Sequence, residues 1–144
     1  NIDDERSYMH ANGIAHCDIK PDNILINSDN KAILADFGFI TDQELTKSGK
    51  CTNEYAAPEI LRSNIEPYDP KKSDIWSLGV TLYVMYTRSH LFAKNEPRTQ
   101  YRINMKLKSI KNRKLRDLIQ KMIKRDPDSR LTIDEVKNHE YLLH

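Results

Sequence analysis

One segment of the chain is apolar on nearly every side, and this feature constrains the fold most. The stretch SDIWSLGVTLYVMYTR occupies residues 73–88 and lacks the polar face that a surface helix turns toward solvent. A helix of this composition has to be buried, so the rest of the chain must pack around it. We expect Ser73 to be its N-cap and Trp76 to be a core residue, because serine favours that position and a large aromatic side chain buries much area.

Two further segments nearer the C-terminus follow helical patterns. The stretch KLRDLIQKMIKR at residues 114–125 places its apolar side chains at steps of three and four, which predicts an amphipathic helix ending before Pro127. The stretch TIDE at residues 132–135 is a capping box, in which threonine and glutamate side chains each bind a backbone N–H at the start of a helix. The chain is therefore expected to be mainly helical.

Only one part of the sequence predicts strands. Two short apolar runs, Ile24 to Ile26 and Ala32 to Ala35, are separated by turn-forming Ser, Asp and Asn residues, which predicts a small β-hairpin. Residues 37–58 show no sustained period and are rich in Thr, Ser, Lys and Glu, which is typical of a long exposed loop. Long ordered loops often carry functional residues.

The composition narrows the class of protein. A chain of 144 residues is long enough for about one domain with its own core. With 23 basic and 21 acidic residues, the net charge of +2 is too balanced to indicate nucleic acid as the main partner. No run of about 20 apolar residues is present to span a membrane, and two cysteines give no disulfide framework. We therefore expect an intracellular protein, cytoplasmic or nuclear. The basic residues from Lys106 to Lys124 favour a solvated helix face over a binding patch.

A polar loop at residues 16–23, HCDIKPDN, carries the chemistry of the chain. Two acids, a lysine and an amide around a proline fit neither a helix interior nor a central strand. Phosphoryl transfer needs a carboxylate to accept the hydroxyl proton, a cation near the moving phosphoryl oxygens, and oxygen ligands for Mg²⁺. This loop, together with Asp36 at the end of the second predicted strand, supplies all three.

The same loop resembles the catalytic loop of the protein kinase family, which reads H-R-D-L-x-x-x-N. The sequence DFG at residues 36–38 matches the family's metal-binding motif. The sequence APE at residues 57–59 matches the end of the family's activation segment, and DIWSLGV at residues 74–80 matches its buried central helix. The resemblance implies a mainly α fold with a small β-hairpin. This is the kinase-like C-terminal large lobe (α+β) without its N-terminal lobe, so that residues 1–144 would form a partial protein kinase catalytic domain.

The resemblance also implies a role for each matching residue near the loop. Asp18 would be the catalytic base that orients and deprotonates the substrate hydroxyl, and Lys20 would bind the nucleotide and neutralise charge on the transferring group. Asn23 and Asp36 would hold Mg²⁺ against the phosphates of ATP, and Leu25 would form the floor under the adenine. The implied cofactors are ATP and Mg²⁺.

Other matches lie outside that loop. Thr52 corresponds to the threonine that bonds to the catalytic aspartate and lysine. Arg130 corresponds to the arginine that pairs with the glutamate of the APE motif, here Glu59. Asp74 corresponds to the residue that anchors the catalytic loop through its backbone amides. Tyr55 is expected to pack rather than to be a phosphorylation site.

Two functions remain open from the sequence. The first is a serine/threonine protein kinase acting on a protein substrate, a class indicated by the lysine two residues after the aspartate. The second is a noncatalytic pseudokinase or truncated kinase lobe that serves as a protein-binding module. The intact loop favours the enzyme, whereas the family's glycine-rich loop and V-A-I-K lysine, which have no counterpart in the sequence, favour the module. We expect the chain to begin within a helix of a larger protein and to need the missing N-terminal lobe in cis for activity.

Cysteine replaces the arginine of the family's catalytic loop. Cys17 stands where that arginine normally receives a phosphate on the activation segment. We therefore expect activity that does not depend on phosphorylation of Thr46 or Ser48. A redox link between Cys17 and Cys51 is a further hypothesis, against which the reducing intracellular environment argues.

Overall fold

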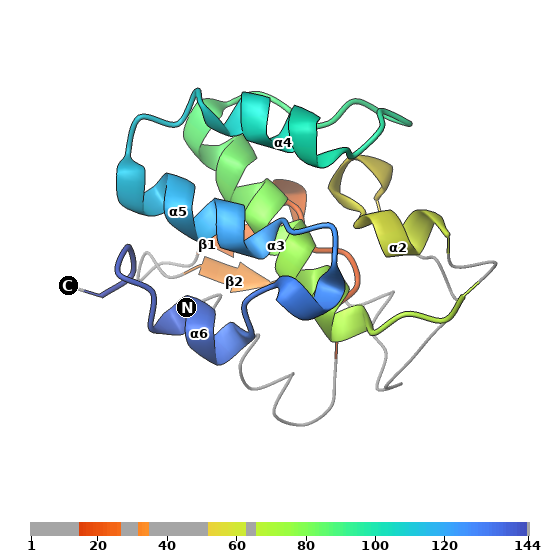
Figure 1. The fold of residues 1–144 in the computed structure, drawn as a ribbon. Coiled ribbons are helices and arrows are strands. Elements are labelled where there is room, and N and C mark those ends of the chain that lie inside the picture. Colours follow the sequence, from red (N-terminus) through yellow and green to blue (C-terminus); the bar gives the residue numbers. More distant parts are fainter. Residues whose placement is uncertain (1–14, 27–31, 35–51, 63–65, 144) are drawn as a thin grey trace.

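The computed structural model describes residues 15–26, 32–34, 52–62 and 66–143. These residues are mostly helical and contain one pair of short strands (Figure 1). In chain order the strands and α-helices are β1 (Ile24–Ile26), β2 (Ala32–Leu34), α2 (Pro58–Leu61), α3 (Pro70–Thr87), α4 (Gln100–Leu107), α5 (Arg113–Met122) and α6 (Ile133–Lys137). Short 3-10 turns lie at Pro21–Asn23, Asn53–Tyr55 and Pro127–Ser129. Among the described helices, none combines the length and the apolar character needed to cross a membrane.

Helix α3 runs through the centre of the described structure and is buried along most of its length (Figure 1). Trp76 is fully buried and stacks on Phe92, with the two ring centroids 5.9 Å apart. The predictions of a buried central helix and of a core tryptophan are both confirmed. Helix α3 is therefore the fixed element against which the neighbouring segments are placed.

The start of α3 differs from the prediction, because Ser73 is not the N-cap. Asp69 takes that position, and its side chain accepts the backbone N–H of Lys71 at 2.9 Å. Pro70 is the first helical residue, where its fixed φ suits a helix and its missing N–H is not needed. Ser73 lies one turn inside the helix and donates its hydroxyl to Glu59 Oε1 at 3.0 Å.

Helix α5 packs directly against α3 at a glycine. A Cβ atom at Gly79 would lie 2.9 Å from Ile123 Cγ2 and 3.0 Å from Met122 Cβ, closer than packed carbon atoms approach. The predicted amphipathic helix is present and buries Leu115 and Leu118 on its inner side. It ends at Met122, before the proline, as the pattern indicated.

Helix α6 begins with the predicted capping box. Thr132 Oγ1 accepts the backbone N–H of Glu135 at 3.2 Å, and Glu135 Oε1 accepts the backbone N–H of Thr132 at 3.0 Å. The last helix is thus fixed at its start by its own sequence, and this prediction is confirmed.

Strands β1 and β2 pair in antiparallel fashion. The register places Ile24 opposite Leu34, Leu25 opposite Ile33 and Ile26 opposite Ala32. Strand β1 follows the 3-10 turn at Pro21–Asn23 directly. The pairing therefore extends the polar loop at residues 16–23 into regular structure.

Candidate active site

The loop at residues 16–23 is tied to helix α3 by one carboxylate. Asp74 Oδ2 accepts the backbone N–H of His16 at 2.8 Å, and Oδ1 accepts the backbone N–H of Cys17 at 2.9 Å. Asp74 is 1% exposed, so these charge-assisted hydrogen bonds lie away from water, where they are stronger. The predicted anchoring contact of Asp74 is confirmed.

Asp18 is part of a hydrogen-bond chain that joins two segments distant in sequence. Its Oδ1 accepts the hydroxyl of Thr52 at 2.7 Å and the backbone N–H of the same residue at 3.3 Å. Lys20 Nζ donates to Thr52 Oγ1 at 3.0 Å and lies 3.9 Å from Asp18 Oδ2. Because an ammonium group only donates, the hydroxyl proton of Thr52 must point to Asp18. The three side chains therefore form one ordered unit.

Asn23 faces Asp18 from the 3-10 turn that ends the loop. Its Nδ2 donates to the backbone oxygen of Asp18 at 2.8 Å and to Oδ2 at 3.2 Å. Both partners are acceptors, so the amide nitrogen must be the atom directed at them. The amide oxygen of Asn23 is then the atom left to meet a ligand. On the other side of the loop, the backbone N–H of Asp18 donates to His16 Nδ1 at 3.2 Å.

Several predicted positions lie outside the described residues. Asp36 with the rest of the DFG motif falls there, as do Thr46, Ser48 and Cys51. Leu25 belongs to β1 by its backbone, but its side chain is outside the description. The roles predicted for these residues, and the redox link to Cys51, stay predictions.

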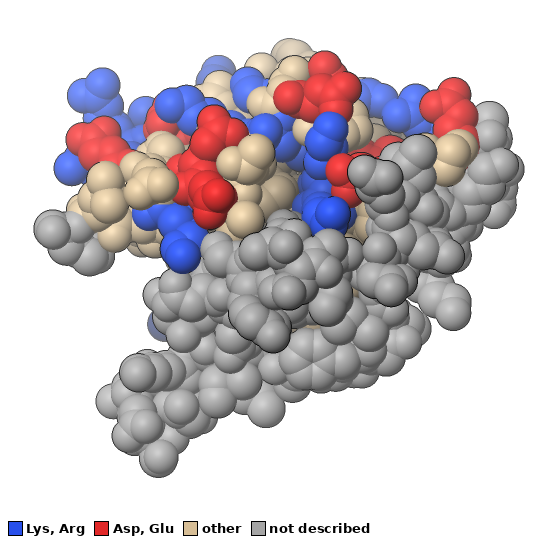
Figure 2. All heavy atoms as spheres, turned by 90° about the horizontal axis from the view of Figure 1, so that it is seen from below, with Lys and Arg blue, Asp and Glu red and all other residues tan. Residues whose placement is uncertain are grey.

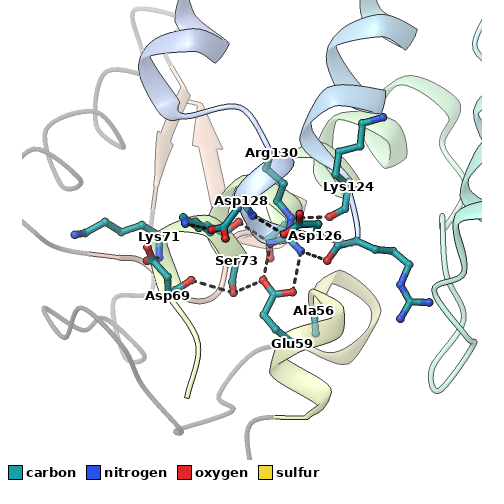
Figure 3. Close-up of polar contacts among 12 residues, drawn as sticks. Ala56, Glu59, Asp69, Lys71, Ser73, Lys124, Asp126, Asp128 and Arg130 are labelled. Carbon is teal, nitrogen blue, oxygen red and sulfur yellow. Dashed lines mark hydrogen bonds and ion pairs between the residues drawn. The ribbon is translucent and has the colours of Figure 1, made fainter. Parts of the chain in front are cut away.

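Glu59 of helix α2 and Arg130 meet in a buried, two-pronged ion pair (Figure 3). Arg130 Nη1 donates to Glu59 Oε1 at 2.5 Å, and Nη2 donates to Oε2 at 2.8 Å. Arg130 also donates to the backbone oxygens of Lys72 at 2.9 Å and Lys124 at 2.8 Å, while Ser73 donates to Glu59. This network joins the end of the APE motif to α3 and to the turn before α6.

Arg98 holds the segment that follows Thr52, and no motif in the sequence singles it out. Its side chain is buried, its Nε donates to the backbone oxygen of Ala56 at 2.7 Å, and its Nη2 donates to that of Asn53. The guanidinium group lies over the ring of Phe92, 4.9 Å from the centroid. Because the acceptors of Arg98 are backbone carbonyls, they leave no pattern of residue types, and only the folded chain reveals the contact.

Tyr55 packs inside this segment, as predicted. The residue is 7% exposed, and Ser77 of α3 donates its hydroxyl to the backbone oxygen of Tyr55 at 2.8 Å. Burial raises the pKa of the Tyr55 phenol, and the negative charges of Asp22 and Glu54 raise it further. A buried, neutral phenol is typical of a packing residue.

Comparison with known proteins shows which family the chain belongs to. The protein kinase domain family matches residues 6–142 of the chain. A putative serine/threonine-protein kinase of Acanthamoeba polyphaga mimivirus is 41% identical over 145 residues, which are 93% of this chain and 51% of that protein. Testis-specific serine/threonine-protein kinase 1 of Mus musculus is 36% identical over 146 residues, which are 92% of this chain and 40% of that protein.

A third relative is more distant in sequence. The Aurora kinase of Debaryomyces hansenii is 33% identical over 145 residues, which are 94% of this chain and 34% of that protein. The chain thus spans about a third to a half of the length of these three relatives. By the family match and by these identities, the chain belongs to the eukaryotic-type protein kinase family.

Proposed function

We propose that this chain carries the catalytic residues of a serine/threonine protein kinase, which transfers the γ-phosphoryl group of ATP to a hydroxyl of a protein substrate. One observation carries the proposal. Asp18 Oδ1 and Lys20 Nζ share the hydroxyl of Thr52, at 2.7 and 3.0 Å. A carboxylate and a cation are thereby held in a fixed arrangement, which is what a base and a phosphoryl-binding cation require.

Asp18 would act as the base through Oδ2. Its Oδ1 is occupied by Thr52, whereas Oδ2 accepts only a longer hydrogen bond, at 3.2 Å, from Asn23 among the described residues. The hydroxyl proton of the substrate would pass to Asp18 as the substrate oxygen bonds to the γ-phosphorus and the bond from that phosphorus to the oxygen of the departing ADP breaks. Lys20 would place its positive charge beside the phosphoryl oxygens during this step.

Asn23 fits the role of a magnesium ligand. Its amide nitrogen is directed at two oxygens of Asp18, so its amide oxygen is the atom it can offer, and Mg²⁺ prefers oxygen ligands. We infer that Asn23 and Asp36 would hold the ion, which neutralises charge on the nucleotide phosphates when bound. The contact between Asn23 and Asp18 would also keep the base next to the metal-binding amide.

The remaining predicted residues would position the site rather than react. Thr52 would orient Asp18 and Lys20 relative to each other, and Leu25 would support the adenine ring. The pair of Glu59 and Arg130 would hold the end of the activation segment against the core.

The test is ³²P transfer from Mg-ATP to a generic Ser/Thr protein substrate. The assay uses the full-length protein that carries these 144 residues, because the family's glycine-rich loop has no counterpart among them. We expect Asp18→Asn to lower turnover by about 10²- to 10⁴-fold, since a positioned base contributes that much. Thr52→Val should lower turnover, and Thr52→Ser should retain it because only the hydroxyl is needed.

Two results would overturn the proposal. One is an Asp18→Asn protein as active as the wild type. The other is a folded wild-type protein that transfers no phosphate to any substrate tried, which would favour the noncatalytic binding module.

A further inference from the structure

Positive charge is concentrated in one stretch of the chain. Residues 106–125 contain nine basic residues and one acidic residue, whereas the whole chain has a net charge of +2. The stretch therefore carries +8 and the remainder −6. It includes the end of α4, the connection to α5, and all of α5.

Two adjoining hollows lie along this stretch. The larger, of about 620 Å³, is lined by Arg113, Lys114, Arg116, Asp117, Gln120 and Glu140. The smaller, of about 460 Å³, is lined by Asn104, Leu107, Lys108, Arg116 and Gln120. Arg116 and Gln120 of α5 line both hollows. The smaller lies between α4 and α5, and the larger is lined by α5 and by Glu140, which follows α6. We call the two adjoining hollows together the α4–α5 groove.

The two carboxylates that line the α4–α5 groove are already neutralised. Asp117 Oδ2 lies 2.9 Å from Lys121 Nζ and 2.7 Å from His139 Nε2. These partners hold the pKa of Asp117 below its ordinary value, chiefly through the hydrogen bond with His139. Glu140 Oε1 lies 3.3 Å from Lys114 Nζ. Neither acid is therefore left to offset the other cations of the groove.

Three cations of the groove have no carboxylate partner among the described residues. These are Lys108, Arg113 and Arg116, of which the last donates only to the neutral backbone oxygen of Ile110, at 3.1 Å. Arg113 is also the first residue of α5, where a positive charge opposes the helix macrodipole. The charge of Arg113 therefore does not help α5 to fold, and an anion bound in the groove would complement all three cations.

The lining of the groove favours a peptide over a single-stranded nucleic acid. Among the described residues that line it there is no aromatic side chain, so this lining lacks the stacking platform that single-stranded nucleic acids use. The amides of Asn104 and Gln120 suit a peptide backbone, because an amide group can both donate and accept hydrogen bonds. Figure 2 shows the molecule from below, where basic and acidic side chains are interspersed on the described part of that face.

We propose that the α4–α5 groove binds an acidic peptide segment of a partner protein. The carboxylates of that segment would meet Lys108, Arg113 and Arg116, and its backbone would meet the two amides. None of the lining residues belongs to the catalytic loop. The proposal therefore does not depend on phosphoryl transfer and is tested by binding alone.

The experiment is fluorescence anisotropy of a labelled peptide of alternating Glu and Ser, titrated with the full chain. The test variant is Lys108→Gln with Arg113→Gln, two exposed residues of the groove. The matched control is Lys94→Gln with Arg125→Gln, two exposed residues that do not line it, so the net charge falls equally in both proteins. Circular dichroism verifies that each double variant is folded.

We expect the test variant to bind the acidic peptide about tenfold more weakly, and the control to change by less than about twofold. A peptide with Gln in place of Glu should bind far more weakly than the acidic one. Equal weakening in both double variants, or equal binding of the two peptides, would overturn the proposal. So would a DNA oligonucleotide or a phosphatidylserine vesicle that binds more tightly than the acidic peptide and is released by the test variant.

Discussion

Cys17 adopts a left-handed backbone conformation, with φ of 70°, and its N–H donates to the carboxylate of Asp74 at 2.9 Å. A residue other than glycine in this conformation costs about 1–3 kcal/mol and persists only where its surroundings hold it. Asp18 follows directly in the chain. The position of the proposed base thus depends on a strained residue that the central helix fixes from 57 positions away.

Replacing Asp74 by asparagine should disturb both stability and activity. The amide nitrogen of asparagine cannot accept a hydrogen bond, so one of the N–H groups of His16 and Cys17 loses its partner. Losing a buried hydrogen bond to a charged group costs about 1.5–3 kcal/mol, which urea unfolding should measure. Phosphate transfer should fall with it, because Asp18 shifts. Asp22→Asn, which changes an exposed carboxylate of the same loop, is the control, and equal stability of the two variants would contradict the prediction.

Phosphorylation of the activation segment should matter little. Cys17 is 8% exposed and its side chain cannot carry a positive charge, so it cannot form the charge-assisted pair with a phosphate that the family's arginine forms. Replacing Thr46 and Ser48 together by alanine should leave turnover within about twofold. The measurement is the rate of phosphate transfer by wild type, double variant and phosphatase-treated wild type. A fall of more than about tenfold in the transfer rate of the double variant would contradict the prediction and show that another residue binds the phosphate.

The parts of the fold that follow from local pattern could be predicted from the sequence. Helix α3 is apolar all round, α5 has a helical period, and the capping box at Thr132 is contained in four residues. The prediction that Ser73 is the N-cap of α3 was wrong. Serine is a good N-cap in general, but Pro70 favours the first helical position, and this makes Asp69 the N-cap. The placement of that cap depended on a single neighbouring residue.

The site divides in a similar way. The contact of Thr52 with the loop HCDIKPDN could be predicted, because the family's motifs specify residue types at fixed spacings. Arg98 could not, because it binds backbone carbonyls that every residue has. Gly79 could not either, because nothing in its own segment indicates that α5 approaches it so closely.

Replacing Gly79 by alanine should destabilise the protein although alanine favours helices. The added methyl group would lie 2.9 Å from Ile123 Cγ2. Overpacking of a core costs about 1–3 kcal/mol, which exceeds the roughly 0.5–1 kcal/mol that alanine gains over glycine within a helix. Urea unfolding measures the net loss. Adding Ile123→Leu, which removes the clashing Cγ2, should recover part of it, whereas a stabilised single variant would contradict the predicted contact.

The pair of Glu59 and Arg130 should be strongly coupled in stability. Both side chains are nearly or fully buried, so removing one leaves the other as an uncompensated charge. Arg130→Met should cost about 3–5 kcal/mol. The double variant with Glu59→Met should cost less than the sum of the two single variants, by about 0.5–3 kcal/mol. Urea unfolding of all four proteins gives this coupling, and additive losses would show that the pair contributes only through its separate packing contacts.

The contribution of Glu96 to stability should depend on pH. Glu96 Oε2 lies 2.5 Å from Lys106 Nζ, and this hydrogen bond, assisted by the backbone N–H of Ala93, holds the pKa of Glu96 below its ordinary value of 4.5. A carboxyl group with a lowered pKa stabilises the fold fully above its ordinary pKa, and that stabilisation is lost as the pH falls through the lowered value. The difference in unfolding free energy between wild type and Glu96→Gln should therefore be about 1 kcal/mol at neutral pH and shrink toward zero in acid. Urea unfolding at a series of pH values measures this difference.

The control is Glu140→Gln, because the ion pair of Glu140 with Lys114 is exposed. Its unfolding free energy should differ little from that of the wild type at any pH. A difference between wild type and Glu96→Gln that stayed constant in acid would refute the assignment.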